Sequence, residues 1–215
     1  MRAVVIPCRG GSKRIPKKNL VDLNGKPLMS YAIQSSLEIT GEVYVSTDCP
    51  EIERVAIDYG AKIIKRPDAI STDFCKTNAA IEHFLEEVDN VDIFACVQAT
   101  TPLMQPSYLK EAFNKVRSGD FDSAISVCES KKFYWTGEGQ PVGFSVKHRP
   151  RTQDMDKRYS ENGAFYVTTR ESFFKNESLM GGKVGLVVTP QIISLEIDDW
   201  DDLRLVRALA TGGLR

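Results

Sequence analysis

Short apolar runs alternate with longer stretches in which apolar residues recur every three or four positions along the first 130 residues of the chain. The runs are typical of buried parallel strands, and the recurring positions indicate amphipathic helices. Proline opens three of the helical stretches and glycine closes one of these three, as is common at helix ends. The pattern predicts strands at residues 2–8, 42–46, 61–65, 91–98 and 123–128, and helices at 27–38, 50–60, 78–88 and 106–117.

This alternation predicts an α/β fold with a mostly parallel sheet covered by helices on both faces. Right-handed crossovers bring the carboxyl ends of the strands to one edge, where ligands bind in such sheets. Residues 131–160 mix aromatics, glycines, prolines and charges without a clear period, so we expect irregular strands and a flap there. Further strands are expected at 163–168, 184–189 and 192–197, and a closing helix at 199–211. We expect residues 1–215 to form a single domain.

Composition narrows the function classes. The 28 basic and 29 acidic residues give a net charge of −1, which argues against the broad basic face of a nucleic-acid binder. The five cysteines are scattered without a CxxC pair, so neither a disulfide framework nor a zinc site is expected. No stretch has the length of a signal peptide or a membrane span. We therefore expect a cytoplasmic protein with no membrane partner.

The loop after the first strand carries the first candidate chemistry. It reads IPCRGGSKRIPKKNL and holds two glycines, a serine and five cations. Glycines let backbone N–H groups approach an anion, and the cations neutralise its charge, so a triphosphate is the natural ligand. A P-loop would need GxxxxGK[ST] and a dinucleotide site GxGxxG, and neither is present. A solvated basic loop is the alternative. The cations are Arg9, Lys13, Arg14, Lys17 and Lys18.

The same run resembles the opening motif of the acylneuraminate cytidylyltransferases, IPARxGSKxIPxKN, with Cys8 where alanine is usual. The resemblance implies a Rossmann-like three-layer α/β/α nucleotidyltransferase fold. It also implies that Arg9 and Lys18 bind and orient the CTP phosphates during catalysis. The Kdo cytidylyltransferases resemble this loop too, but they carry STRLPGK, which counts against the eight-carbon sugar. The remaining CTP-binding residues implied by the loop are Gly11, Ser12, Lys13 and Asn19.

Two later stretches extend the resemblance. Arg66-Pro67 and Thr77 match a family segment that closes over the cytidine, which implies that Thr77 contacts CTP. The run QATTPL at residues 98–103 resembles the family's QPTSPLR. It implies that Gln98 contacts nucleotide and sugar, and that Thr100 and Thr101 contact the sugar. A plain strand-to-helix turn also uses Thr-Pro, so this run alone is weaker support.

The runs RPRTQD (149–154) and YSENGAFY (159–166) resemble the family's RPRRQD and YxENGxFY, which shape the sugar pocket. An acidic sugar needs a cation for its carboxylate, and a planar guanidinium can donate two hydrogen bonds to it. We therefore assign Arg151 to the carboxylate, with Gln153 and Tyr159 lining the sugar. The alternative is an exposed basic loop before a strand.

Acidic residues near the end of the chain suggest a metal site. Glu196 and Asp198 are two positions apart on the expected strand 192–197 and its end, so their side chains should share a face. Two carboxylates can hold Mg²⁺, with water and phosphate oxygens completing its shell. The family has Asp-x-Asp here, and Glu196 departs from it. Asp201 and Asp202 are better explained as caps of the following helix.

The resemblance implies that CMP passes from CTP to the anomeric hydroxyl of N-acetylneuraminic acid or a close nine-carbon relative, with Mg²⁺ as cofactor. It also implies a homodimer in which part of residues 131–160 reaches the partner's active site. Legionaminic acid and KDN stay open as sugars. Pseudaminic acid ranks low, because enzymes for it tend to differ where this chain has ENGAFYV. The alternative of another class is a non-catalytic nucleotide-sugar binder.

Overall fold

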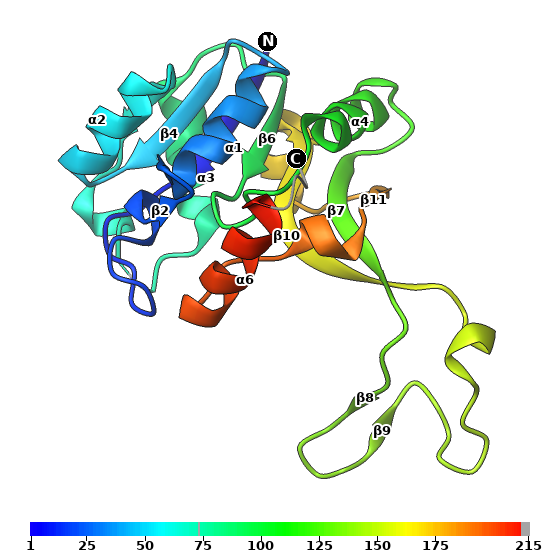
Figure 1. Cartoon of the computed structure of the whole chain (residues 1–215). Helices are drawn as coiled ribbons and strands as arrows, with labels where there is room; N and C mark the ends of the chain where they lie inside the picture. Colours follow the sequence, from blue (N-terminus) through cyan, green and yellow to red (C-terminus); the bar gives the residue numbers. More distant parts are fainter. Residues whose placement is uncertain (73, 212–215) are drawn as a thin grey trace.

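A mixed seven-stranded sheet forms the centre of the computed structural model, which describes residues 1–72 and 74–211 (Figure 1). The strand order is β11-β7-β10-β6-β1-β4-β5. Neighbouring strands are parallel except at β10, which runs antiparallel to both β6 and β7. The prediction of a mostly parallel sheet is therefore confirmed. The strands are β1 Arg2–Pro7, β4 Val43–Thr47, β5 Lys62–Lys65, β6 Ile93–Val97, β7 Ser123–Ser130, β10 Arg158–Thr169 and β11 Val184–Val188.

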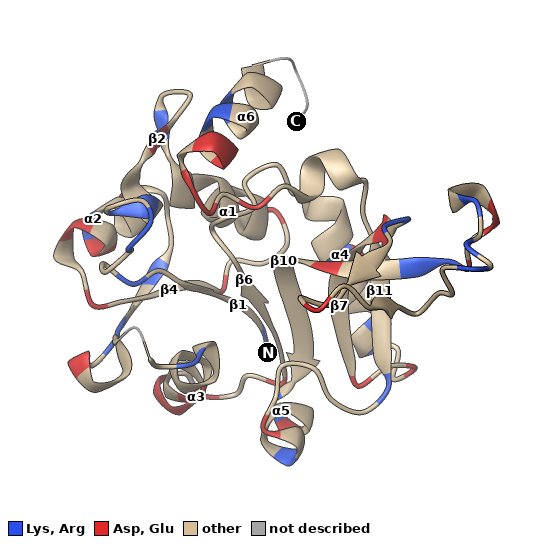
Figure 2. Cartoon of the chain, turned by 90° about the horizontal axis from the view of Figure 1, so that it is seen from below, with Lys and Arg blue, Asp and Glu red and all other residues tan. Residues whose placement is uncertain are grey.

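Helices cover both faces of this sheet, which gives the expected three layers (Figure 2). One face carries α1 Leu28–Leu37, α2 Pro50–Asp58 and α4 Pro106–Arg117, and the other carries α3 Thr77–Glu87 and α5 Arg170–Asn176. The helix α6 Trp200–Thr211 packs beside the loops at the carboxyl ends of the strands. None of the described helices combines the length and the apolar character that crossing a bilayer requires.

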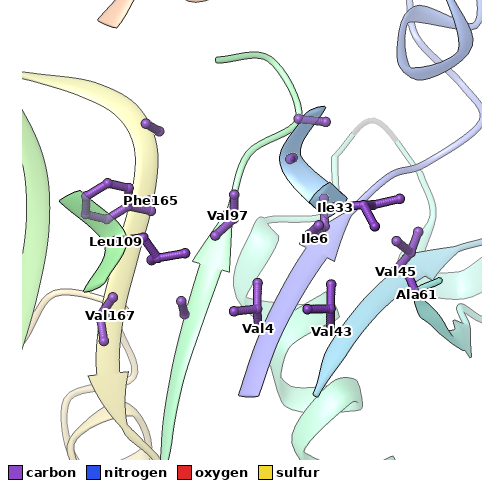
Figure 3. Packing of buried hydrophobic residues seen from close by; sticks show 14 of the residues in the cluster. Val4, Ile6, Ile33, Val43, Val45, Ala61, Val97, Leu109, Phe165 and Val167 are labelled. Carbon is purple, nitrogen blue, oxygen red and sulfur yellow. The ribbon is translucent and has the colours of Figure 1, made fainter. Parts of the chain in front are cut away.

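The period-two alternation of the central strands divides the core into two layers. Val4 and Ile6 of β1 pack with Ile33 of α1, while Leu109 of α4 lies over Phe165 further along the same face (Figure 3). The intervening β1 residues point to the opposite face, where the ring of Phe94 on β6 packs at a tilt against Phe84 of α3 and edge to face against Phe173 of α5. Because both faces are buried, the strands read as continuous apolar runs.

Residues 131–157, which we call the arm, leave the sheet after β7 and return at the start of β10 (Figure 1). The arm holds the two-residue strands β8 Tyr134–Trp135 and β9 Pro141–Val142 and the 3₁₀ helix η3 Thr152–Asp154. The ring of Phe144 in the arm packs edge to face against the rings of both Phe133 and Trp135. The sequence predicted irregular structure here, and the structure agrees.

Two predicted elements need correction. The strand expected at 192–197 is wrong, because Gln191–Ser194 form a 3₁₀ helix (η4) and the following residues pair with no strand. The apolar period arises because Ile193 and Ile197 pack against Leu203 and Val206 of α6. The strand expected at 163–168 begins earlier, at Arg158. The helix α5 was not predicted.

Minor elements complete the described chain. The small strands β2 Asp22–Leu23 and β3 Lys26–Pro27 form a hairpin after the first loop. Two further 3₁₀ helices are η1 Lys18–Leu20 and η2 Asp68–Ile70.

Candidate functional site

The cationic loop between β1 and η1 is held in place from several sides. Its backbone N–H at Gly10 donates to Asp48 Oδ1 over 2.8 Å, and the buried Asn19 donates from Nδ2 to the carbonyl of Arg9 over 3.2 Å. The side chain of Ile15 is 1% exposed in the apolar cluster that also contains α6. Lys17 adopts a left-handed φ of 52°. These contacts fix the loop at the carboxyl edge of the sheet.

Four of the loop's cations converge on a cavity of about 420 Å³. They are Arg9, Lys13, Arg14 and Lys18, and one carboxylate, that of Glu196, also lines the cavity. A small cavity this rich in cations suits a polyanion such as a triphosphate. The structure therefore brings together most of the predicted site, namely Arg9, Ser12, Lys13, Lys18, Asn19, Gln98, Thr100 and Glu196. Gly11 lies exposed in the loop and is not among the lining residues.

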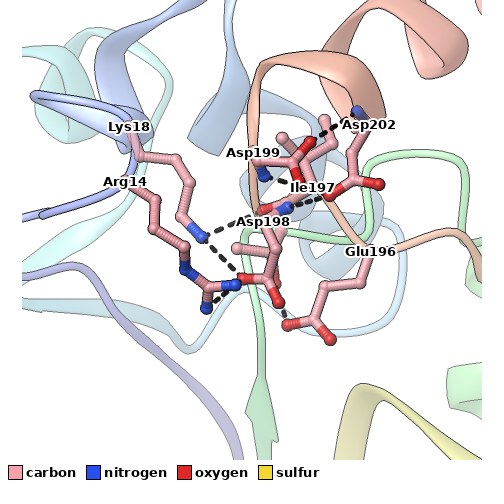
Figure 4. A network of polar contacts seen from close by, with 8 residues as sticks. Arg14, Lys18, Glu196, Ile197, Asp198, Asp199 and Asp202 are labelled. Carbon is pink, nitrogen blue, oxygen red and sulfur yellow. Dashed lines mark hydrogen bonds and ion pairs between the residues drawn. The ribbon is translucent and has the colours of Figure 1, made fainter.

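Asp198 lies beside this cavity and pairs with two of its cations (Figure 4). Its Oδ1 is 2.9 Å from Arg14 Nη2 and 3.2 Å from Lys18 Nζ. Lys18 Nζ also donates to the carbonyl of Ile197 over 2.9 Å. The cations that would bind phosphates are thus held by the same segment that carries the predicted metal ligands.

The acidic start of α6 forms a reciprocal cap. Asp202 Oδ2 accepts from the backbone N–H groups of Asp198 and Asp199, and Asp199 Oδ1 accepts from those of Asp201 and Asp202. These backbone hydrogen bonds, led by that from Asp202, hold the pKa of Asp199 below its usual value. The prediction that Asp202 caps the helix is confirmed, and Asp201 pairs with Arg204 on the exposed side.

Glu196 and Asp198 flank the buried Ile197, whose backbone N–H donates to the carbonyl of Thr100 over 2.8 Å. Glu196 Oε1 accepts from Thr100 Oγ1 over 3.1 Å. Within residues 1–72 and 74–211 no three His, Cys, Asp or Glu side chains gather as a complete metal cage. Mg²⁺ is often held by only one or two carboxylates plus phosphate oxygens of a substrate, so the two side chains fit that ion.

A second cavity of about 160 Å³ shares Pro7, Arg9 and Gln98 with the first. It is lined by the predicted Thr77 and by Arg66, which is buried and bonds Ser46 through Nε (3.1 Å to Oγ) and Nη2 (2.8 Å to the carbonyl). Burial lowers the pKa of Arg66. The sequence placed Arg66 within a motif without giving it a role, because its burial beside this cavity shows only in the folded chain.

A third cavity of about 390 Å³ meets the first at Glu196. The sequence assigned no role to its other lining residues, although the motif YSENG supplies part of its wall. Glu161 within that motif accepts from the hydroxyl of Tyr166 over 3.1 Å. The polar lining comprises Cys128, Glu129, Ser130, Lys131, Lys132, Ser160, Glu161, Asn162, Gln191, Ser194 and Glu196.

Four predicted sugar contacts lie outside these cavities. Arg151 and Gln153 are on the arm, where Arg151 Nε is 2.6 Å from Asp154 Oδ2. Tyr159 lies partly exposed at the start of β10. Thr101 is 4% exposed and donates to the carbonyl of Gln98 over 3.3 Å, so its hydroxyl shapes the turn.

Comparison with known proteins gives concordant matches. The cytidylyltransferase family model matches residues 3–181. Pseudaminic acid cytidylyltransferase of Campylobacter jejuni strain 81-176 is 33% identical, over 95% of this chain and 94% of that protein. N-acylneuraminate cytidylyltransferase B of Danio rerio is 34% identical, over 93% of this chain and 49% of that protein.

Among solved structures, a CMP:2-keto-3-deoxy-manno-octonic acid synthetase complexed with CTP has the same fold. Its TM-score is 0.74 at 22% identity, over 99% of each chain. The 4-diphosphocytidyl-2C-methyl-D-erythritol synthase of Anaerococcus prevotii gives a TM-score of 0.71 at 11% identity, over 98% of each chain.

Proposed function

The chain belongs to the cytidylyltransferase family, and we propose that it transfers CMP from CTP to the anomeric hydroxyl of a nine-carbon 2-keto acid sugar. The hydroxyl oxygen forms a bond to the α-phosphorus, pyrophosphate leaves, and the hydroxyl proton is released. The observation that carries this proposal is the cavity where Arg9, Lys13, Arg14 and Lys18 converge, with one neighbouring cavity on each side. One neighbour suits the cytidine and the other the sugar.

The residues of the cationic cavity can catalyse this displacement by neutralising charge. In the transition state, negative charge grows on the bridging oxygen of the departing pyrophosphate, and preorganised cations there lower the barrier. Both Arg9 and Lys18 line the cavity at the carboxyl edge of the sheet, which supports this role for them. Holding both substrates in adjoining cavities also removes the entropy cost of their encounter.

We call the cavity lined by the four cations the phosphate cavity and the third cavity, of about 390 Å³, the sugar cavity. Glu196 and Asp198 would hold Mg²⁺ between these two cavities. When bound, the ion would polarise phosphate oxygens and offset their charge. Asp198 must then exchange its two ion pairs for the metal, which frees Lys18 and Arg14 to bind phosphate oxygens. The same movement would couple metal binding to CTP binding.

The third cavity matches the chemistry of a sugar with several hydroxyl groups. Glu129 and Glu161 can accept hydrogen bonds from hydroxyls, while Lys131 and Lys132 add positive charge at the same wall. The named relatives act on acylneuraminates and on pseudaminic acid at similar identity. Pseudaminic acid therefore ranks beside N-acetylneuraminic acid here, above the low rank that ENGAFYV alone gave it. Legionaminic acid and KDN stay in the set to be tested.

The arm supports a homodimer as part of the proposal. A two-stranded hairpin is marginally stable alone, and Tyr134, Trp135, Val142 and Val146 expose apolar surface on it. A second copy would cover this surface and bring Arg151 to a neighbouring sugar cavity.

The five cysteines are free thiols, as in a reducing compartment, which supports the expected cytoplasmic location.

Pyrophosphate release tests the reaction. Purified protein is incubated with CTP, Mg²⁺ and one of five acids: N-acetylneuraminic, pseudaminic, diacetyllegionaminic, KDN or Kdo. We expect release with a nine-carbon acid and none without sugar, and mass spectrometry should show the CMP-sugar. CTP binding with no release from any acid would refute the transfer and favour a nucleotide-sugar binder.

A further inference from the structure

The strand β10 contains a bulge at the wall of the sugar cavity. Glu161 pairs with Val127 and Tyr166 with Ile125, so β10 advances five residues while β7 advances two, which leaves three extra residues on β10. Gly163 within the bulge has a φ of 67°, where an L side chain would be strained. Bulges of this kind redirect side chains beside active sites.

The bulge turns the side chain of Asn162 inward, into a buried polar network. Its Nδ2 donates to Thr189 Oγ1 (2.8 Å) and to Ser194 Oγ (3.0 Å), and its Oδ1 accepts from the N–H of Ala164 (3.2 Å). The hydroxyls of Thr189 and Ser194 are 2.7 Å apart. Asn162 is 8% exposed, and both of its N–H donors are used inside the protein. It therefore has no donor left for a ligand, although it lies at the cavity wall.

This network holds the segment that carries the two predicted metal ligands. Ser194 ends η4 two residues before Glu196, and the N–H of Ile197 is fixed to the carbonyl of Thr100. The segment is thus anchored at both ends, by Asn162 through Ser194 and by Thr100. A Cβ at Gly163 would lie 3.5 Å from Glu196 Oε2, so the backbone of the bulge also lies against that carboxylate.

We propose that Asn162 is a positioning residue for the metal site: its buried carboxamide sets the place of Glu196, and so the metal geometry between nucleotide and sugar. The inference rests on the proposed function. It gives a physical reason for Asn-Gly within the motif YSENG. The asparagine joins three elements, and the glycine permits the bulge beside the carboxylate. Residues that orient metal ligands commonly change metal affinity by about 10- to 100-fold when removed.

The test measures Mn²⁺ binding to the protein saturated with CTP, by the loss of the free Mn²⁺ signal in electron paramagnetic resonance. The variants are Asn162→Ala and the pair Thr189→Val and Thr189→Ser. Valine keeps the shape of threonine without its hydroxyl, whereas serine keeps the hydroxyl. We expect Asn162→Ala and Thr189→Val to weaken Mn²⁺ binding by about tenfold or more, and Thr189→Ser to restore it. The half-saturating Mg²⁺ concentration for pyrophosphate release should rise by the same factor.

Two results would overturn the inference. A raised KM for the sugar with unchanged Mn²⁺ binding would place Asn162 in contact with substrate. A lowered Tm with unchanged Mn²⁺ binding would make the network only structural. Failure of the proposed function is seen separately, because wild-type protein would then release no pyrophosphate while the Mn²⁺ comparison could still be read.

Discussion

Replacing Asp198 by asparagine should change CTP binding and turnover in opposite directions. In the structure Asp198 neutralises Arg14 and Lys18, two of the four cations of the phosphate cavity. Without metal, the carboxylate therefore competes with the phosphates for the same cations and also repels them. Asparagine has nearly the same shape but no charge, so it removes both effects.

The magnitude follows from Coulomb's law. The side chain of Asp198 is 36% exposed, so an effective dielectric constant of about 40 lies between the usual surface value and water. At about 7 Å, two unit charges then repel by about 1.2 kcal/mol, or roughly an eightfold change in affinity. From this estimate we expect Asp198→Asn to bind CTP about 5- to 10-fold more tightly than the wild-type protein in EDTA. Its turnover with Mg²⁺ should fall by at least about 100-fold, because a metal ligand is lost.

Isothermal titration with CTP in EDTA and pyrophosphate release in Mg²⁺ measure the two effects. Asp201→Asn is the matched control, because it makes the same charge change on an exposed residue of the same helix, paired with Arg204. In this control, both the CTP affinity in EDTA and the turnover in Mg²⁺ should stay near the wild-type values. Weaker CTP binding by Asp198→Asn in EDTA would refute the competition for cations. Normal turnover at saturating Mg²⁺ would remove Asp198 from the metal site.

Four further predictions concern other parts of the molecule. Arg9→Ala should lower kcat/KM for CTP by about 100-fold or more in the pyrophosphate assay, and an unchanged value would refute the role of the loop. Arg151→Ala should raise the KM for the sugar and spare that for CTP, whereas equal losses would place Arg151 elsewhere. Phe94→Ala, which empties a fully buried site, should lower the free energy of unfolding by about 3–5 kcal/mol in urea titrations. Burial raises the pKa of Cys8 and Cys96 to about 12. The folded state therefore keeps protons that the unfolded state loses, and stability should fall as pH rises above about 9, by up to about 1.4 kcal/mol per thiol per pH unit. A variant with both Cys8→Ala and Cys96→Ala should lose less free energy of unfolding as pH rises, and a slope equal to that of the wild-type protein would contradict the role of these thiols.

The fold was predictable because its central strands are buried on both faces, and such strands read as apolar runs bounded by turn residues. The helix at 106–117 was predicted at its observed bounds, since Pro106 opens it and one stripe of apolar side chains faces the sheet. The helix α5 was missed. It is only seven residues long and begins directly at the end of β10, where Thr169 accepts from the N–H of Ser172. No apolar period can show over so few residues.

In the candidate site, too, the residues that could be predicted are those that lie in one continuous stretch of sequence. Arg9 and Lys18, which line the first cavity, could be singled out in advance because they belong to one continuous loop whose motif carries the family resemblance. Arg66 and the residues of the sugar cavity were harder to find, because they come from several elements that meet only in the folded chain. Arg151 lies on the arm and lines none of the three cavities described above, and no pattern in one sequence shows what a second copy would cover.

The wrong strand at 192–197 shows why the predicted placement of Glu196 and Asp198 does not depend on a regular strand. Strand periodicity put Glu196 and Asp198 on one face. The real segment is unpaired, yet it alternates in the same way, because Ile197 is buried under α6 and its N–H bonds the carbonyl of Thr100. The alternation arises because an apolar residue stands between two acidic ones. In any extended segment with one buried side, the buried apolar residue leaves the side chains before and after it on the opposite side. A regular strand would draw its position from a neighbouring strand, whereas this segment draws it from Ser194, Thr100 and the side chain of Asn162. A metal site built on such a segment depends on a few buried hydrogen bonds, which is why a substitution remote from the phosphates should change metal affinity.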